Sequence, residues 1–254
     1  MRKWIKITQF ILIHITVSLI ASEKNDPPNI VFLFADDAGY ADFGFQGSTK
    51  FDTPNLDILA SKSVKFTQAY TTAAVCGPSR AGLMTGRYQQ RFGVEENNVP
   101  SAMSPAGLTG AEMGLPLDQQ TIADYLKKAG YQSIYLGKWH LGGADRYHPL
   151  KRGFDEFYGF RGGARSYWPY VTPPQDPLRR WERDYKNFKE HEGYLTDAIA
   201  DEAVEVIERH QDVPFFLFVS FNAVHTPMHY LENDLPDGNI RLTQKRQQLY
   251  AMTK

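Results

Sequence analysis

Short apolar runs alternate with helical patterns along this sequence, and this alternation constrains the fold more than any other feature. Four runs rich in β-branched and aromatic residues predict strands, at Asn29–Ala35, Val64–Tyr70, Tyr131–Leu136 and Pro214–Phe221. Helices are predicted from Thr53-Pro54 to about Ser61, over Thr121–Ala129 and over Tyr194–His210. The order of these elements predicts right-handed crossovers and therefore an α/β fold, a doubly wound and mostly parallel sheet with helices on both faces. The first apolar run has the continuous character of a strand buried on both faces.

Polar residues follow three of these strands at the point where each strand ends. Asp36 and Asp37 follow the first, Lys138 and His140 follow the third, and His225 follows the last. Taken singly, an acidic pair more often caps a turn, and a histidine or lysine is more often satisfied or solvated. Ligands of doubly wound sheets, however, collect beyond the carboxyl ends of the strands. Three segments meeting at one sheet edge therefore favour a functional site, and adjacent carboxylates favour a hard cation such as Ca²⁺ or Mg²⁺.

The first 22 residues have the outline of a signal peptide. Basic residues precede an apolar run from Phe10 to Ala21, which ends in small residues. The run is short and is interrupted by His14, so we expect cleavage and export to the periplasm or the exterior. An uncleaved membrane anchor is the alternative, and no other membrane contact is expected.

Charge balance and cysteine count exclude several classes of protein. The 28 basic and 29 acidic side chains leave no positive excess to hold a nucleic acid backbone, so nucleic acid is not an expected partner. The single cysteine, Cys76, can form neither an intrachain disulfide nor a four-thiolate zinc site. The sequence also lacks internal repeats and the glycine-rich phosphate loops of nucleotide sites. A lone thiol in an exported protein requires its own explanation.

The segment Cys76–Arg87 (CGPSRAGLMTGR) is the most specific feature of the sequence. A purely structural interpretation is a buried cysteine before a helix, with Pro78 in the first turn and Gly86 at its end. That interpretation leaves unexplained why a thiol, Ser79 and Arg80 stand where the helix N-terminus favours anions.

The run C-x-P-S-R at Cys76, followed by T-G ending at Gly86, resembles the signature of formylglycine-dependent sulfatases of the alkaline phosphatase superfamily. Other segments are similar to the family and stand in its order: NIVFLFADD from Asn29, GKWHLG from Gly137, HPLKRGFDEFYG from His148, and HTP from His225. The resemblance covers nearly all of the chain after the leader. It extends to enzymes of the arylsulfatase and N-acetylgalactosamine-6-sulfatase type.

The resemblance implies a modified nucleophile and a metal. Cys76 would be oxidised by a separate maturation enzyme to formylglycine, whose hydrated diol attacks the sulfate ester. Asp36, Asp37 and the modified Cys76 would bind Ca²⁺, with Mg²⁺ the less expected ion. A diol suits this chemistry because its covalent intermediate releases itself by elimination.

The resemblance also assigns the remaining site residues. A sulfate ester is an anion that repels a nucleophile, so positive groups must neutralise it before attack. Arg80 would orient the diol, and Lys138 would contact both the diol and the sulfate. His140 would hold a diol hydroxyl and later act as the base, while His225 would protonate the leaving alcohol.

The sequence departs from the family pattern at its C-terminal end. Sulfatases supply further metal ligands, including an Asp-Asn pair, and a second sulfate-binding lysine from a part of the domain that follows the last strand seen here. Residues 23–254 are therefore interpreted as the N-terminal part of the catalytic domain, and this chain alone is expected to be inactive or nearly so. A helix beginning near Leu242 is predicted to leave Leu249, Tyr250 and Met252 without packing partners, which would make the chain poorly soluble.

Aromatic residues are concentrated between Phe154 and Tyr185, where they either offer stacking faces to a sugar ring or pin a long loop to the domain. Together with export, they favour a sulfated glycan, such as an N-acetylhexosamine sulfate, over an aryl sulfate. Two other functions stay open. A phosphonate or phosphodiester hydrolase of the same superfamily would be distinguished by rates on matched sulfate and phosphate esters. A non-catalytic truncated domain would bind anionic glycans or nothing.

Overall fold

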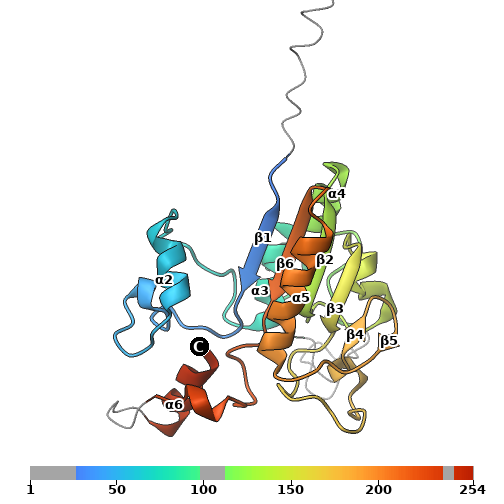
Figure 1. Cartoon of the computed structure of the whole chain (residues 1–254). Helices are drawn as coiled ribbons and strands as arrows, with labels where there is room; N and C mark the ends of the chain where they lie inside the picture. Colours follow the sequence, from blue (N-terminus) through green and yellow to red (C-terminus); the bar gives the residue numbers. More distant parts are fainter. Residues whose placement is uncertain (1–26, 98–111, 237–242, 254) are drawn as a thin grey trace, which may run out of the picture.

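The computed structural model describes residues 27–97, 112–236 and 243–253, and the predicted leader lies outside them. Its centre is a six-stranded sheet of order β1-β6-β2-β3-β4-β5 (Figure 1). In chain order the strands are β1 Ile30–Phe34, β2 Gln132–Lys138, β3 Glu156–Phe160, β4 Glu182–Arg183, β5 Asn187–Phe188 and β6 Phe215–Ser220. The first four strands of the sheet run parallel and the last two pair antiparallel. The predicted mostly parallel α/β fold is confirmed.

The helices lie on both faces because the chain crosses the sheet in two directions. Between β1 and β2 it passes through α2 (Pro54–Ser61), α3 (Cys76–Thr85) and α4 (Ile122–Lys128), and between β3 and β6 it returns through α5 (Leu195–Arg209). Right-handed crossovers in opposite directions place their helices on opposite faces. Figure 1 shows α5 on the near face, with α3 and α4 behind the sheet.

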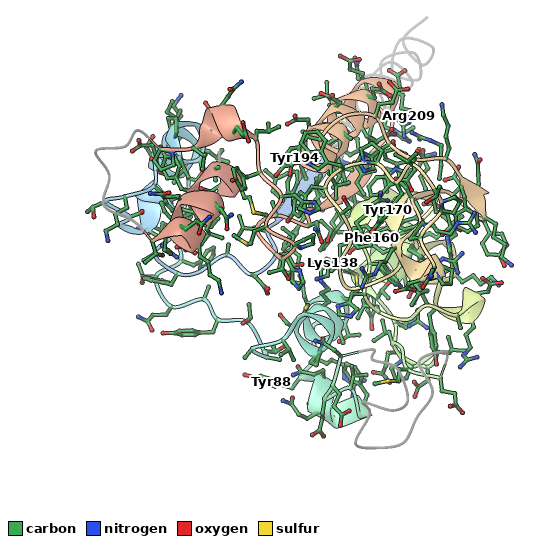
Figure 2. All side chains as sticks on the ribbon, turned by 90° about the horizontal axis from the view of Figure 1, so that it is seen from below. Tyr88, Lys138, Phe160, Tyr170, Tyr194 and Arg209 are labelled. Atoms are coloured by element: carbon green, nitrogen blue, oxygen red, sulfur yellow. The ribbon has the colours of Figure 1, made fainter. Side chains whose placement is uncertain are left out.

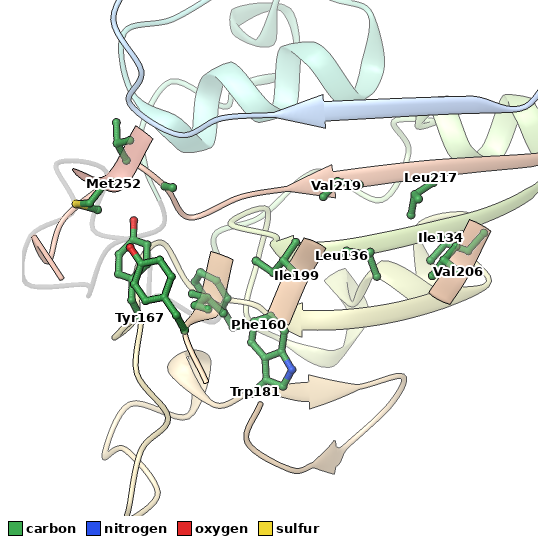
Figure 3. Close-up of a cluster of buried hydrophobic side chains, with 14 of the residues drawn as sticks. Ile134, Leu136, Phe160, Tyr167, Trp181, Ile199, Val206, Leu217, Val219 and Met252 are labelled. Carbon is green, nitrogen blue, oxygen red and sulfur yellow. The ribbon is translucent and has the colours of Figure 1, made fainter. Parts of the chain in front are cut away.

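Alternate residues of β6 divide the core into two layers. Leu217 and Val219 pack with Ile199 of α5, whereas Phe216 and Phe218 join Met84 of α3 on the opposite face. Figure 3 shows the first layer, in which α5 side chains meet those of β2 and β6. All six residues of β6 are buried, which is the pattern of a central parallel strand.

Two strand predictions were wrong, and both concern the same edge of the sheet. β1 is not buried on both faces, because it is an edge strand in the described sheet and Val31 and Leu33 remain 45% and 54% exposed. Val64–Tyr70 is not a strand, and its alternating apolar residues Val64, Phe66 and Tyr70 are about as exposed as free side chains, at 82%, 78% and 81%. An alternating pattern needs a neighbouring strand, and the described residues provide none beside this segment.

The helix predictions held more closely. α2 begins where expected, but the Thr53 hydroxyl accepts a hydrogen bond from the Gly44 N–H and donates one to Asp57 rather than capping the helix. Thr121 caps α4 in a reciprocal box with Asp124. Short 3₁₀ helices cover Gly44–Gln46, Gln89–Phe92, Asp145–Tyr147, Pro149–Lys151, Pro177–Arg179 and Glu232–Asp234.

The last helix, α6 (Gln244–Thr253), corrects the expectation of an unpacked end. The Tyr250 ring lies 5.4 Å from that of Phe51, and both are buried. Met252 joins the layer against α5, as Figure 3 shows, and Leu249 packs beside it. The described part of the chain contains no helix of the length and apolarity that a membrane span requires.

Candidate active site

The carboxyl ends of the strands gather the predicted site residues. Asp36 follows β1, Lys138 is the last residue of β2, and Cys76 is the first residue of α3. Figure 2 looks onto this edge of the sheet and shows Lys138 near the centre of the molecule. His140 and His225 lie just beyond the ends of β2 and β6.

Asp36, Asp37 and Cys76 form a compact cluster of possible ligand atoms. One atom from each residue lies within 4.8 Å of the other two. Adjacent residues of an extended strand point to opposite sides, but Asp37 has a left-handed backbone with φ of 58°, which breaks that alternation. Asp36 is buried and Asp37 is 55% exposed, so the cluster is reached from solvent on one side.

Two cations lie beneath this cluster. The buried Lys138 ammonium donates a hydrogen bond to Asp36 Oδ2, and Arg80 Nη2 lies 3.6 Å from Asp36 Oδ1. Burial and the neighbouring Arg80 charge together lower the pKa of Lys138, although Asp36 opposes them. One buried carboxylate therefore faces two buried cations, and the group carries an excess of positive charge that suits an anionic ligand.

The Arg80 guanidinium is held by residues that the sequence analysis missed. Its Nη1 donates to Ser220 Oγ at 2.6 Å and to the Lys138 carbonyl at 2.8 Å. The Tyr135 hydroxyl donates to the same carbonyl at 2.6 Å. Ser220 ends β6 as Lys138 ends β2, but it lies inside the predicted strand Pro214–Phe221, so the sequence marked neither Ser220 nor Tyr135 as a site residue.

His225 stands on the exposed side of the cluster. Its Nε2 lies 3.7 Å from Asp37 Oδ2, and its Nδ1 lies 2.6 Å from the Thr226 carbonyl oxygen. A hydrogen bond with Cys76 raises the pKa of His225 against the effect of burial. Burial would raise the pKa of the Cys76 thiol, but His225, Lys138 and Arg80 lower it overall.

His140 is buried, with a left-handed φ of 55°. Burial, followed by the charges of Lys138 and Arg80, holds its pKa well below the ordinary range, which favours the neutral form of the imidazole. Its backbone N–H donates to the Arg161 carbonyl at 3.2 Å. Gly163 leaves room for the ring, because a Cβ there would lie 2.6 Å from His140 Cε1.

The aromatic stretch after β3 is mainly structural. Eight aromatic side chains lie between residues 157 and 185. Four of them are buried: Phe157, Phe160, Tyr167 and Trp181. Tyr158 and Tyr170 are half-buried, and Trp168 and Tyr185 are exposed. Most of these rings therefore pin the segment to the sheet. Of the eight, only Trp168 and Tyr185 are exposed, at 43% and 42%, and the Tyr185 ring is packed by Lys151, Arg161 and Lys186.

A cavity of about 510 Å³ adjoins α3, and its lining includes Phe34, Ser79 and Leu83. None of the predicted site residues lines it. The candidate site is therefore the sheet edge itself.

Comparison with known proteins gives one consistent result. The family model for sulfatases matches residues 28–249. N-acetylgalactosamine-6-sulfatase of Mus musculus is 36% identical over 233 residues, which are 87% of this chain and 44% of that protein. The crystal structure of Ps i-CgsB in complex with k-i-k-neocarrahexaose is 36% identical, with a TM-score of 0.79 over 89% of this chain and 51% of that one. The structure of BT4656 in complex with its substrate D-glucosamine-2-N,6-O-disulfate is 28% identical, with a TM-score of 0.63 over 82% and 37%.

Proposed function

The chain belongs to the sulfatase family, and we propose that the complete protein hydrolyses sulfate esters on a glycan by means of a formylglycine made from Cys76. The chain spans about half the length of the relatives it matches, so the proposal concerns the complete protein. The observation that carries it is the cluster of Asp36, Asp37 and Cys76 above two buried cations.

The donor set fits a hard divalent cation only if residue 76 supplies oxygen. Ca²⁺ binds six to eight oxygen ligands, roughly, and a thiolate is too soft a partner for it. The two carboxylates supply oxygen already, and a hydrated formylglycine at position 76 would add another. Asp36, Asp37 and the modified Cys76 would then hold Ca²⁺, which neutralises the charge of the sulfate when it is bound. Further ligands would come from beyond the described residues.

The remaining site residues would have two roles, stabilising negative charge and transferring protons. Lys138 and Arg80 would stabilise the anionic sulfate and orient the nucleophile, because both are buried beside Asp36. His225 would donate a proton to the leaving alcohol, since it stands on the solvent side of the cluster with its Nε2 3.7 Å from Asp37 Oδ2. His140 would take a proton from the nucleophile's hydroxyl, because its lowered pKa favours the neutral imidazole.

A sulfated glycan is the proposed substrate class. Ps i-CgsB and BT4656 were solved with carbohydrate ligands, which supports a sugar sulfate here. An N-acetylhexosamine sulfate is the more specific proposal, supported by the likeness to N-acetylgalactosamine-6-sulfatase. Export directed by the leader, which would then be cleaved, would bring the enzyme to its glycan in the periplasm or outside the cell.

The test uses the complete protein made together with a formylglycine-generating enzyme. Sulfate release from sulfated N-acetylhexosamine oligosaccharides is measured beside hydrolysis of matched phosphate esters, and peptide mass spectrometry reads the state of residue 76. We expect sulfate release that requires formylglycine and disappears in Cys76→Ala. Full activity with an unmodified thiol would exclude the mechanism, and faster phosphate ester hydrolysis would favour the phosphodiesterase alternative.

A further inference from the structure

The turn that carries His225 is held from two sides, and on the side of β1 it is held by backbone hydrogen bonds alone. Asn222 to His225 follow β6, and the turn closes through a hydrogen bond from the His225 N–H to the Asn222 carbonyl at 2.9 Å. Toward β1, the Asp36 N–H donates to the Ala223 carbonyl at 2.8 Å, and the Val224 N–H donates to the Asp36 carbonyl at 2.7 Å. These bonds fix the middle of the turn relative to the metal cluster.

The other side of the turn is held by a side chain. The Tyr167 hydroxyl lies 2.7 Å from the Asn222 carbonyl oxygen and 2.8 Å from that of His225, so one O–H is shared between the two ends of the turn. Tyr167 is fully buried, and its ring stacks on Tyr194 at 5.5 Å. Its own carbonyl accepts the Leu195 N–H at 2.8 Å, which ties it to the start of α5. Figure 3 shows Tyr167 at the carboxyl end of the sheet, beyond Phe160.

We propose that Tyr167 is a positioning residue that aims His225 at the leaving group by holding the carbonyl of His225. The inference rests on the proposed function of this site. The Tyr167 hydroxyl contacts the carbonyls of Asn222 and His225, so it would act through the backbone of the turn. Without its hydroxyl the His225 carbonyl loses a buried partner, and on this side the turn keeps only its own bond from the His225 N–H to the Asn222 carbonyl. A proton donor displaced by a fraction of an ångström loses much of its effect.

The chain offers a matched control for Tyr167→Phe. Tyr194 is the ring stacked on Tyr167, it is also buried, and its hydroxyl donates to a carbonyl of the same loop, that of His229, at 2.9 Å. Tyr194→Phe therefore removes an equivalent hydroxyl four residues away from His225. Both variants are prepared in the complete, matured protein, and their folding is compared by urea unfolding.

The first readout is independent of activity. Diethyl pyrocarbonate modifies accessible imidazoles, and peptide mass spectrometry gives the rate at His225. We expect this rate to rise about threefold or more in Tyr167→Phe, because the turn opens more often, and to stay unchanged in Tyr194→Phe. An unchanged rate in Tyr167→Phe overturns the inference, whatever the enzyme does.

The second readout is the leaving group. Tyr167→Phe should lower kcat on a glycan sulfate roughly 10- to 100-fold with little change in KM, and should affect nitrophenyl sulfate far less. Equal losses on both substrates, or equal behaviour of the two variants, contradict a positioning role. If the parent protein releases no sulfate while His225 still becomes reactive in Tyr167→Phe, the proposed function fails and the positioning of His225 stands.

Discussion

Two groups of charged side chains lie beside this sheet, each with an arginine and a carboxylate buried at its centre, and they differ in how these charges are paired. At the candidate site, Asp36 faces Arg80 and Lys138, and Arg80 Nε and Nη2 have no hydrogen-bond partner in the described structure. Near β3 and β4, Arg161 faces Glu182 in a two-pronged pair, with Nε to Oε2 at 2.8 Å and Nη2 to Oε1 at 2.7 Å. We call these the edge cluster and the strand cluster.

The strand cluster is complete in itself. The remaining guanidinium nitrogen, Arg161 Nη1, donates to Asp145 at 2.9 Å, and Lys186 pairs with the same carboxylate at 2.7 Å. The Lys186 N–H also donates to Glu182 at 2.5 Å. Each positive charge has a carboxylate and each carboxylate oxygen of Glu182 has a donor, so the charges of this group are balanced within the protein. The neighbouring His148 Nε2 lies 3.6 Å from Glu182 Oε1 and has no hydrogen-bond partner among the described residues.

The two clusters differ in how far the protein alone satisfies their buried charges. Burying a charge is costly unless it is paired and fully hydrogen-bonded. The strand cluster meets that condition. In the edge cluster one buried carboxylate, Asp36, faces two buried cations, and two guanidinium nitrogens of Arg80 have no hydrogen-bond partner in the described structure. An imbalance of this kind persists where a ligand completes it, which here would be an anionic sulfate and a metal.

The largest expected effect separates the clusters by activity. Lys138→Met in the complete, matured protein removes a buried charge beside the nucleophile, and we expect kcat/KM on a sulfate ester to fall roughly 10³- to 10⁵-fold. The matched control is Lys186→Met in the strand cluster, which should keep its activity within about twofold because it touches no site residue. Sulfatase assays on protein shown by circular dichroism to be folded give the answer. A kcat/KM of Lys138→Met within tenfold of the parent value would contradict the proposal that the edge cluster is catalytic and the strand cluster is structural.

A second prediction tests the exposed side of the edge cluster. A sugar alcohol leaves poorly without a proton, whereas nitrophenolate leaves unaided, so His225→Ala should reduce kcat roughly 10²- to 10⁴-fold on a glycan sulfate and much less on nitrophenyl sulfate. His210→Ala, at the end of α5 on the opposite edge of the sheet, serves as the control and should show no dependence on the leaving group. If both substrates lose rate equally in His225→Ala, this histidine binds sulfate or supports structure, and the proton comes from another group.

The strand cluster should respond in stability rather than in rate. Glu182→Gln keeps the side-chain shape but leaves the Arg161 charge buried without its main partner, and we expect a loss of roughly 3–5 kcal/mol in the free energy of unfolding. Asp145→Asn, at a position 42% exposed, should cost about 1 kcal/mol or less. Urea unfolding measures both, and kcat of the folded fraction should be unchanged. A large drop in kcat in Glu182→Gln would mean that the two clusters are coupled.

The sequence predicts a structural feature well when that feature depends on neighbouring residues in the chain, and poorly when it depends on distant ones. β1 and β6 have the same apolar character, yet only β6 has neighbours on both sides, so the burial of β1 could not be deduced from its own residues. The hairpin of β4 and β5 was missed because its strands have two residues each and turn through Asp184 and Lys186, both with positive φ.

The same limit applies to the site. Asp36, Lys138 and His225 were predictable because each follows a strand, and the parallel fold brings strand ends together. Ser220 and Tyr167 were not, because their roles depend on partners 82 and 58 residues away, the Lys138 carbonyl and the His225 carbonyl. Such contacts have no signature in the local pattern.

The smallest expected effect is a change in stability at acidic pH that depends on Glu182. Burial would raise the pKa of Glu182, but the neighbouring His148 and the hydrogen bonds from Arg161 lower it to about 2. In the unfolded chain a glutamate titrates near pH 4.3, roughly, so the unfolded state takes up the proton first as the pH falls. The contribution of Glu182 is therefore fully present above that pH, and it is lost as the pH falls toward 2, with a total of at most about 3 kcal/mol. Urea unfolding of the parent and Glu182→Gln between pH 6 and pH 3 isolates this carboxylate, because all other acidic groups are common to both. The difference in the free energy of unfolding between the parent and Glu182→Gln should be roughly 1–2 kcal/mol smaller at pH 3 than at pH 6. A difference that does not change with pH would show that the strand cluster does not hold Glu182 ionised.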